Sequence, residues 1–303
     1  MVSRLLARYF AVLTAMTYVL VVFGAVVRSN GAGLACPDWP LCFGELVPQM
    51  DFGVILEWGH RALAGSVSLG LLLGIALIAR SPAWRALRPW LAVSVAVLAL
   101  QILLGGLTVL HLLARWTVSS HLIMGNAFAL SLAFITVALH ERTGAAAPRP
   151  ALTGAPRALA LGLSALVLLQ LALGGLVASS WAGLACVEWP ACVGTLWFPT
   201  LSGPVGLHIA HRMTGYTLVL ALLSLAALSR GRFGVKPTLA AGLGLCQVAV
   251  GVANVLWRMP VEVTALHSAL AAMIVLVTGL IARDAALSRR PIALHLSSTA
   301  EPA

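Results

Sequence analysis

Four of the eight histidines lie at matching places relative to the apolar segments of the chain. Each lies one turn or less inside one end of an apolar segment, two in each half of the sequence: His60, His121, His211 and His267. Ionisable side chains inside a membrane span are costly and commonly functional. Two imidazoles on neighbouring helices of an apolar bundle suit axial ligation of haem iron. Zinc usually takes three or four ligands that include thiolate or carboxylate, so the pattern favours two haem-iron sites.

The two halves differ at the residue that lies three positions before the first histidine of each pair. This residue is Glu57 in the first half and His208 in the second. Glu57 is either a structural residue paired with Arg61 at i+4, or a carboxylate beside a haem edge that moves protons or stabilises positive charge. We favour the second interpretation for Glu57, and the role of His208 stays open.

Arginines directly follow the first histidine of each pair, at Arg61 and Arg212. A guanidinium at this place is suited to a charge-assisted pair with a haem propionate. The alternative is a side chain that snorkels from the helix end into the interface.

Four of the five cysteines form two pairs with the same spacing, Cys36 with Cys42 and Cys186 with Cys192. A disulfide that closes so short a loop stabilises by roughly 2–3 kcal/mol in the chain-entropy model. The pairs act either as a redox relay or as loop staples, or they rest as free thiols. We favour a staple for the second pair and leave the first open.

The sequence also predicts the places of two tryptophans and of the remaining cysteine. Trp39 and Trp189, one in each cysteine loop, are predicted to help form caps over the haem pockets, as interfacial aromatics often do. The fifth cysteine, Cys246, lies alone in an apolar segment and is interpreted as a core residue.

The chain contains an internal repeat. Residues 33–44 and 183–194 are identical at eight of twelve positions at an offset of 150, and the offsets are 151 from His60 to His211 and 146 from His121 to His267. Each half has an even number of apolar segments, so both halves enter the membrane from the same side. We therefore predict two parallel four-helix repeats, related by a pseudo-twofold axis along the membrane normal.

The composition requires a membrane. Hydrophobic residues make up 60% of the chain and charged residues 9%, with a mean hydropathy of +0.99, whereas soluble domains carry about 25% charged residues. The net charge of +10 comes from short loops and forms no basic stripe, which argues against nucleic acid as a partner. Eight segments have the length of a bilayer span: 9–27, 57–79, 90–110, 118–139, 157–178, 208–229, 238–256 and 264–282.

The positions of the basic residues predict the topology. They concentrate on every second loop and at both termini, so the positive-inside rule places both termini in the cytoplasm of a cell-membrane protein. The long loops 28–56 and 179–207 then face outward, where disulfides persist. We expect an N-terminal half over 1–143, a cytoplasmic linker over 144–156, a C-terminal half over 157–283 and a polar cytoplasmic tail over 284–303.

The motifs together resemble the haem A synthase family. They are the segment 57–61, Glu-Trp-Gly-His-Arg, the two Gly-Leu-Ala-Cys…Trp-Pro…Cys loops and the four repeated histidines, and the resemblance covers roughly residues 9–283. It implies that haem O is oxidised to haem A, for cytochrome c oxidase, by successive hydroxylations that turn the methyl at ring position C8 into a formyl group.

The resemblance also implies a division of labour. The C-terminal half is expected to bind a haem b cofactor through His211 and His267, and the N-terminal half to receive haem O near His60 and His121. The acid that matches Glu57 is required for turnover in the family. The family's first cysteine pair, here Cys36 and Cys42, is associated with activity, and only some members carry the second pair.

Two other classes stay open, a di-haem electron-transfer cytochrome b and a non-catalytic haem carrier. Glu57 discriminates, because an electron-transfer protein has no evident need for a carboxylate beside only one haem. Haem O synthase and cytochrome c oxidase assembly factors are the expected partners besides the lipid bilayer. The electron acceptor, the source of oxygen and the oligomeric state are left open.

Overall fold

The computed structural model describes residues 2–144, 154–229 and 234–288, and in these ranges the chain forms eight long helices and one short 3-10 helix. All eight long helices are long and apolar enough to cross a membrane, which confirms the predicted all-α membrane fold. They are α1 (Val2–Ser29), α2 (Phe52–Ala79), α3 (Trp84–Leu110), α4 (Arg115–Glu141), α5 (Gly154–Ser179), α6 (Gly203–Ser229), α7 (Lys236–Leu256) and α8 (Val261–Leu287), with η1 (Ala182–Leu184) after α5.

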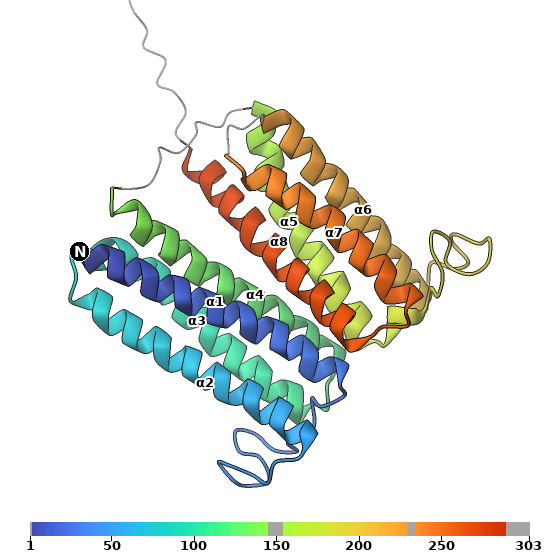
Figure 1. Ribbon diagram of the computed structural model, residues 1–303, viewed down its shortest axis with the longest axis horizontal. Helices are drawn as coiled ribbons and strands as arrows, with labels where there is room; N and C mark the ends of the chain where they lie inside the picture. Colours follow the sequence, from blue (N-terminus) through green and yellow to red (C-terminus); the bar gives the residue numbers. More distant parts are fainter. Residues whose placement is uncertain (1, 145–153, 230–233, 289–303) are drawn as a thin grey trace, which may run out of the picture.

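The helices form two bundles that lie side by side, α1–α4 and α5–α8 (Figure 1). Each bundle has its own apolar core, which includes Phe10, Leu71 and Leu132 in the first and Leu222, Leu225 and Ile281 in the second. The two long loops, between α1 and α2 and between α5 and α6, lie at the same end of the molecule (Figure 1), as two parallel repeats require. The pseudo-twofold axis itself stays a prediction.

Helices in a bilayer gain little from moving apolar side chains out of lipid, which is equally apolar. Their association therefore depends on close packing, which small residues allow. At the contact of α1 with α2, the Tyr9 hydroxyl donates to the Gly70 carbonyl at 2.6 Å. A methyl group at Gly74 would come within 2.7 Å of the Phe10 ring. These two glycines let the α1 aromatics lie against the backbone of α2.

The bundles meet through α1 against α8 and α4 against α5. Across this interface the Tyr18 hydroxyl donates to the Ala269 carbonyl at 3.1 Å, and Ser119 and Ser179 share a hydrogen bond of 3.3 Å. A methyl group at Gly175 would lie 3.2 Å from Cα of Ser119, so the α4 and α5 backbones approach closely there.

Several helices extend beyond the segments expected from hydropathy. α2 begins at Phe52, where the Asp51 carboxylate accepts the N–H of Val54 at 2.8 Å as an N-cap. α5 begins at Gly154, inside the expected linker, and α8 runs to Leu287, past the expected boundary at 283. Hydropathy registers only the membrane core of a helix and misses its more polar ends. The rest of the linker, 145–153, and the tail from 289 lie outside the described residues.

The position of Cys246 differs from the one expected from the sequence. It lies on α7 and is exposed, not buried in the core. A membrane-spanning helix is apolar on its lipid face as well as on its core face, so an apolar sequence context does not place a residue inside the protein.

Candidate functional site

The four histidines lie near the end of the bundles that carries the long loops. His60 is in α2, which begins at Phe52, and His121 is in α4, which begins at Arg115. His211 and His267 occupy the corresponding places in α6 and α8. Each histidine is therefore about two turns inside its helix, deeper than the one turn expected, because the helices begin earlier than their apolar segments.

The second-half histidines form a facing pair. The ring centroids of His211 and His267 are 6.5 Å apart, with the ring planes at 63°. A metal–imidazole bond is about 2 Å long and the ring adds roughly another ångström to its centroid, so one metal ion between two imidazoles separates their centroids by about 6 Å. This separation fits a single iron between the two rings.

Every one of the four rings packs against a glycine of the preceding helix. A methyl group at the glycine would lie 3.0–3.2 Å from Cε1 of the histidine, in the pairs Gly24–His60, Gly105–His121, Gly174–His211 and Gly251–His267. A side chain at these glycines would take the space that the imidazole edge occupies. The backbone of α1, α3, α5 or α7 thus forms one wall of each histidine site.

The ring nitrogens have few protein partners. Among the described residues, the Nδ1 atoms of His60, His121 and His267 are buried without a hydrogen-bond partner. The amide of Gln101 lies 3.3 Å from Nε2 of His121, and that of Gln170 lies 3.2 Å from Nδ1 of His211. Buried polar atoms are normally paired, and these three Nδ1 atoms instead lie beside the glycines of the preceding helices.

The donor set fits a haem better than a bare ion. In the part of the chain that the structure describes, no group of three or more His, Cys, Asp or Glu side chains converges as an ion site. The histidines come in pairs, which is the donor set of an iron whose four equatorial positions are filled by a porphyrin. His60 and His121, on α2 and α4, would hold one such group, and His211 with His267 the other.

Glu57 and Arg61 attach the first cysteine loop to α2. The Glu57 carboxylate is buried, forms an ion pair with Arg61 at 2.6 Å and accepts the N–H of Cys36 at 2.9 Å. The Arg61 guanidinium also donates to the carbonyls of Asp38 and Leu41, at 2.9 and 2.7 Å. The structural interpretation of Glu57 is therefore realised in this structure, while its catalytic role stays a prediction.

His208 and Arg212 repeat this arrangement on α6. The N–H of Cys186 lies 3.3 Å from Nδ1 of His208, and Nε of Arg212 lies 3.2 Å from Nε2. Arg212 donates to the carbonyls of Cys186 and Glu188 at 3.0 and 2.9 Å. A carboxylate accepts at both oxygens, whereas a neutral imidazole accepts at only one nitrogen. A neutral His208 therefore accepts a hydrogen bond from only one of these two donors, the Cys186 N–H or the Arg212 Nε–H, at a time.

The expectation that Arg61 and Arg212 meet haem propionates stays a prediction. Both guanidinium groups are engaged with loop carbonyls in this structure. Neither side chain is free to snorkel away from the loop without breaking those bonds.

Both cysteine pairs are disulfides. The bonds Cys36–Cys42 and Cys186–Cys192 each close a loop whose sulfur-bearing residues are buried. The first loop packs on the bundle through Trp39, because a methyl group at Gly106 would lie 3.0 Å from its indole ring. Gly106 adjoins Gly105, the wall of the His121 site, and this contact supports the predicted cap. In the second loop the Trp189 indole donates to the Tyr216 hydroxyl at 3.0 Å.

Sequence reasoning missed the glycines and glutamines around the histidines. A signal was present, because glutamine precedes the wall glycine by four positions in three helices, at 101 and 105, 170 and 174, and 247 and 251. In α1 the corresponding residue before Gly24 is Leu20. Aligning the four odd-numbered helices with one another would have found this spacing.

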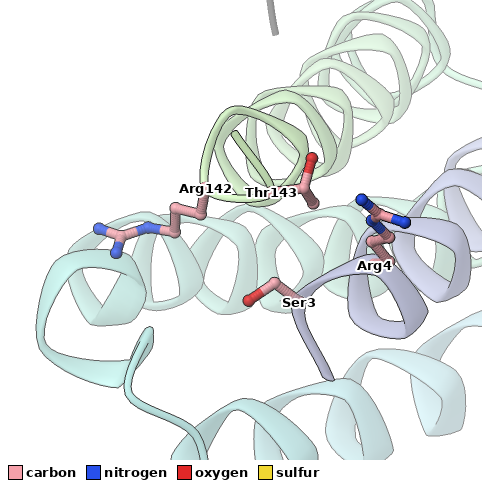
Figure 2. A pocket seen from close by; sticks show the side chains of 4 residues that line it. All are labelled: Ser3, Arg4, Arg142 and Thr143. Carbon is pink, nitrogen blue, oxygen red and sulfur yellow. The ribbon is translucent and has the colours of Figure 1, made fainter. Parts of the chain in front are cut away.

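An open polar cavity lies at the opposite end of the first bundle, lined by Ser3, Arg4, Arg142 and Thr143. Arg4 and Arg142 extend toward opposite sides of it (Figure 2). It lies between the beginning of α1 and the end of α4, far along the helices from the histidines. The cavity therefore takes no part in the histidine site.

Comparison with known proteins agrees with the motifs. The family model described as cytochrome oxidase assembly protein matches residues 7–53 and 49–278. The chain is 34% identical to a haem A synthase of Symbiobacterium thermophilum, over 70% of this chain and 71% of that protein. It is 29% identical to a haem A synthase of Shewanella oneidensis, over 86% and 90% of the two chains. The chain belongs to the cytochrome oxidase assembly protein family.

Proposed function

We propose that this membrane protein is a haem A synthase. It is an oxidoreductase that converts haem O to haem A by oxidising the C8 methyl to a formyl group in successive hydroxylations, and it thereby supplies cytochrome c oxidase. The observation that carries the proposal is the presence of two histidine pairs, only one of which has a buried carboxylate one turn away, at Glu57. The names of the curated relatives support the same activity.

In the proposal, the N-terminal half holds the substrate. His60 and His121 ligate the iron of haem O from α2 and α4, and the glycine walls of α1 and α3 fix the two imidazoles. A farnesylated haem partitions into lipid, so its enzyme is expected to take it up within the bilayer. Trp39 closes the outer side of this site through its contact with α3.

Glu57 is proposed to act on the reacting edge of the substrate. Its carboxylate lies one turn from His60 on the same helix face, with its charge balanced by Arg61 at 2.6 Å. A carboxylate in a low-dielectric site stabilises developing positive charge more strongly than it does in water. It is also able to take a proton from an attacking water molecule.

The C-terminal half is proposed to hold haem b through His211 and His267, with Arg212 near its edge. Haem b, when bound there, supplies one-electron redox chemistry. The 6.5 Å separation of the two rings supports this assignment, as does Gln170, whose amide lies beside Nδ1 of His211, so that Nε2 would be the nitrogen available to a metal.

A second candidate is a di-haem electron-transfer cytochrome b. One observation favours it, because Glu57 and His208 lie against the same two donors, the loop N–H and the arginine of their own halves. Two equivalent electron-transfer sites would show such equivalence. The carboxylate present in only one half favours the synthase.

The decisive experiment is incubation of the purified protein with haem O under oxidising conditions, followed by chromatography of the extracted pigments. A synthase yields haem A or a hydroxylated intermediate, and the His60→Ala variant yields neither. Unchanged haem O with the intact protein, in a preparation that retains its haem absorbance, would leave the electron-transfer candidate.

The assignment of halves is tested by the resident pigment. Replacing His211 or His267 with alanine is expected to remove the low-spin haem b absorbance, and replacing His60 or His121 is expected to leave most of it. The opposite pattern would reverse the assignment of the halves.

The proposed setting is the cytoplasmic membrane with both termini in the cytoplasm, where haem O synthase is able to deliver the substrate. A membrane-impermeant thiol reagent is then expected to label Cys36 and Cys42 in intact cells only after reduction. Labelling that needs cell lysis would contradict this orientation.

A further inference from the structure

We propose that Gly24, Gly105, Gly174 and Gly251 are positioning residues that set the orientation of the four imidazole planes. The inference rests on the haem-binding part of the proposed function and not on the oxidation of haem O. Its test is therefore a property of the bound haem rather than turnover.

The contacts are close and alike. A methyl group would lie 3.1 Å from Cε1 of His60 at Gly24, 3.0 Å from His121 at Gly105, 3.2 Å from His211 at Gly174 and 3.1 Å from His267 at Gly251. The next nearest atom of the ring is Nδ1 in every case, at 3.5–3.8 Å. The same edge of each ring thus lies against the backbone of the preceding helix.

A substitution at these positions has to move the ring. Separations of 3.0–3.2 Å are shorter than ordinary carbon–carbon contacts of about 3.5–4.0 Å, so an alanine methyl would displace the imidazole by a few tenths of an ångström or turn it. The ring is attached to its own helix, and rotation about its side-chain bonds is the least costly response. Residues that orient a metal ligand tune the affinity and the electronic state of the metal.

The four walls are not expected to be equally important. At His211 the ring is also held by the Gln170 amide, 3.2 Å from Nδ1. At His267 the Nδ1 atom is buried without a hydrogen-bond partner. The glycine wall therefore carries more of the orientation at His267, and substitution of Gly251 should disturb the resident haem more than substitution of Gly174.

The chain offers matched controls on the same helices. Gly162 in α5 and Gly242 in α7 have open space where a Cβ would be placed. Gly162→Ala and Gly242→Ala make the same chemical change in the same helices as Gly174→Ala and Gly251→Ala, without touching a histidine. Any general effect of alanine on these helices appears in the controls.

The experiment compares the purified variants by the electron paramagnetic resonance of the ferric low-spin haem, the reductive midpoint potential and the haem content. We expect Gly251→Ala to change the anisotropy of the resonance and to lower haem affinity on the order of tenfold or more, with a smaller change for Gly174→Ala. Gly162→Ala and Gly242→Ala should match the parent. A resonance and potential of Gly251→Ala identical to those of Gly242→Ala would overturn the proposal.

A second variant covers the case in which Gly251→Ala fails to fold. Gly105→Ala changes the first-half site alone, so the resident haem of the second half reports correct folding. The spectrum of added haem O should then differ from the parent, and an unchanged spectrum with unchanged affinity would contradict the proposal. If the parent protein binds both haems but forms no haem A, the result would count against the proposed function and not against this proposal.

Discussion

Glu57 and His208 occupy matching places in the two halves and make matching contacts with different chemistry. Each meets the N–H of the first cysteine of its loop and the guanidinium one turn further along its helix. Only the carboxylate accepts both donors at once. The second loop keeps its fold with a single acceptor at His208, so we expect the first loop to tolerate loss of the extra acceptor and of the negative charge of Glu57.

Glu57→His and Glu57→Gln separate the charge of Glu57 from its contact with the loop. Each variant keeps one acceptor, as His208 does, and removes the charge. We expect near-normal protein levels and retained resident haem, with haem A formation reduced roughly 10²-fold or more, as for loss of a general base or electrostatic stabiliser. Chromatography of the pigments measures the loss.

The exposed loop residue Glu45 provides the control, as Glu45→Gln removes a carboxylate that lies outside the site. Haem A formation at close to the parent rate in Glu57→His would show that the carboxylate is structural.

Asp38 gives the first loop a dependence on pH. Its carboxylate accepts the N–H groups of Gly44 and Phe43, at 2.8 and 2.7 Å. These bonds, that of Gly44 foremost, hold the pKa of Asp38 below its usual range, with help from the charge of Arg61. A carboxyl with a lowered pKa in the folded state stabilises above the unfolded pKa of about 3.9, and this contribution is lost as the pH falls through the lower folded value.

We therefore expect the Cys36–Cys42 disulfide to become easier to reduce below about pH 4. In Asp38→Asn the rate of reduction by a phosphine should already be raised at neutral pH and should change little with acid. Peptide mapping separates this disulfide from Cys186–Cys192, which serves as the internal reference. The same steep acid dependence in Asp38→Asn would assign the effect to another group.

At the scale of elements, one arginine in each half bonds the long loop to its bundle at several carbonyls. Arg212 in α6 donates to the carbonyls of Ala191, Cys186 and Glu188 at 2.9–3.2 Å. A planar guanidinium reaches these separate acceptors at once, whereas a lysine ammonium is a point donor. Arginine is therefore specifically required where α6 meets the second loop.

Arg212→Lys is expected to leave at least one loop carbonyl without its donor, at a cost of about 1–3 kcal/mol for a buried group. The second loop should become more sensitive to limited proteolysis, and the Cys186–Cys192 disulfide more rapidly reduced. Arg115→Lys, at the exposed first residue of α4, is the control. Equal sensitivity of the two variants would mean that Arg212 does not hold the loop.

At the scale of the whole molecule, an ion-pair cluster joins the bundles at the end away from the long loops. Arg283 of α8 is buried and binds Glu141 of α4 through two bonds of 2.9 and 2.8 Å. The neighbouring Asp284 pairs with Lys236 of α7 at 2.5 Å. The cluster thus ties the first bundle to α8 and α8 to α7.

Breaking the Arg283–Glu141 pair should destabilise the association of the halves. Removing one member of a fully buried ion pair costs about 3–5 kcal/mol; the cost is expected to be smaller here, because Arg283 keeps Asp284 at 3.7 Å and the Glu141 side chain is partly exposed. We expect Glu141→Met to lower the thermal transition of the protein in detergent, and the double variant Glu141→Met with Arg283→Met to recover much of the loss. A double variant as unstable as the sum of the two single variants would show that the pair is not coupled.

The sequence by itself determined the membrane class, the eight spans, the duplication and the four histidines. Each follows from local hydropathy or from identity between repeats, and both are visible in the sequence without knowledge of the packing. The haem A synthase resemblance also rests on such local motifs, and the family comparison confirms it.

Only the tertiary structure decided which residues surround the histidines. The glycine walls, the amides of Gln101 and Gln170 and the burial of Glu57 against its loop join residues that are distant in sequence. Cys246 shows why these contacts escaped the sequence, since it is as apolar in context as a core residue and yet is exposed. In a bilayer both the core face and the lipid face of a helix are apolar, so the hydrophobic pattern does not tell which face turns inward, and only packing does.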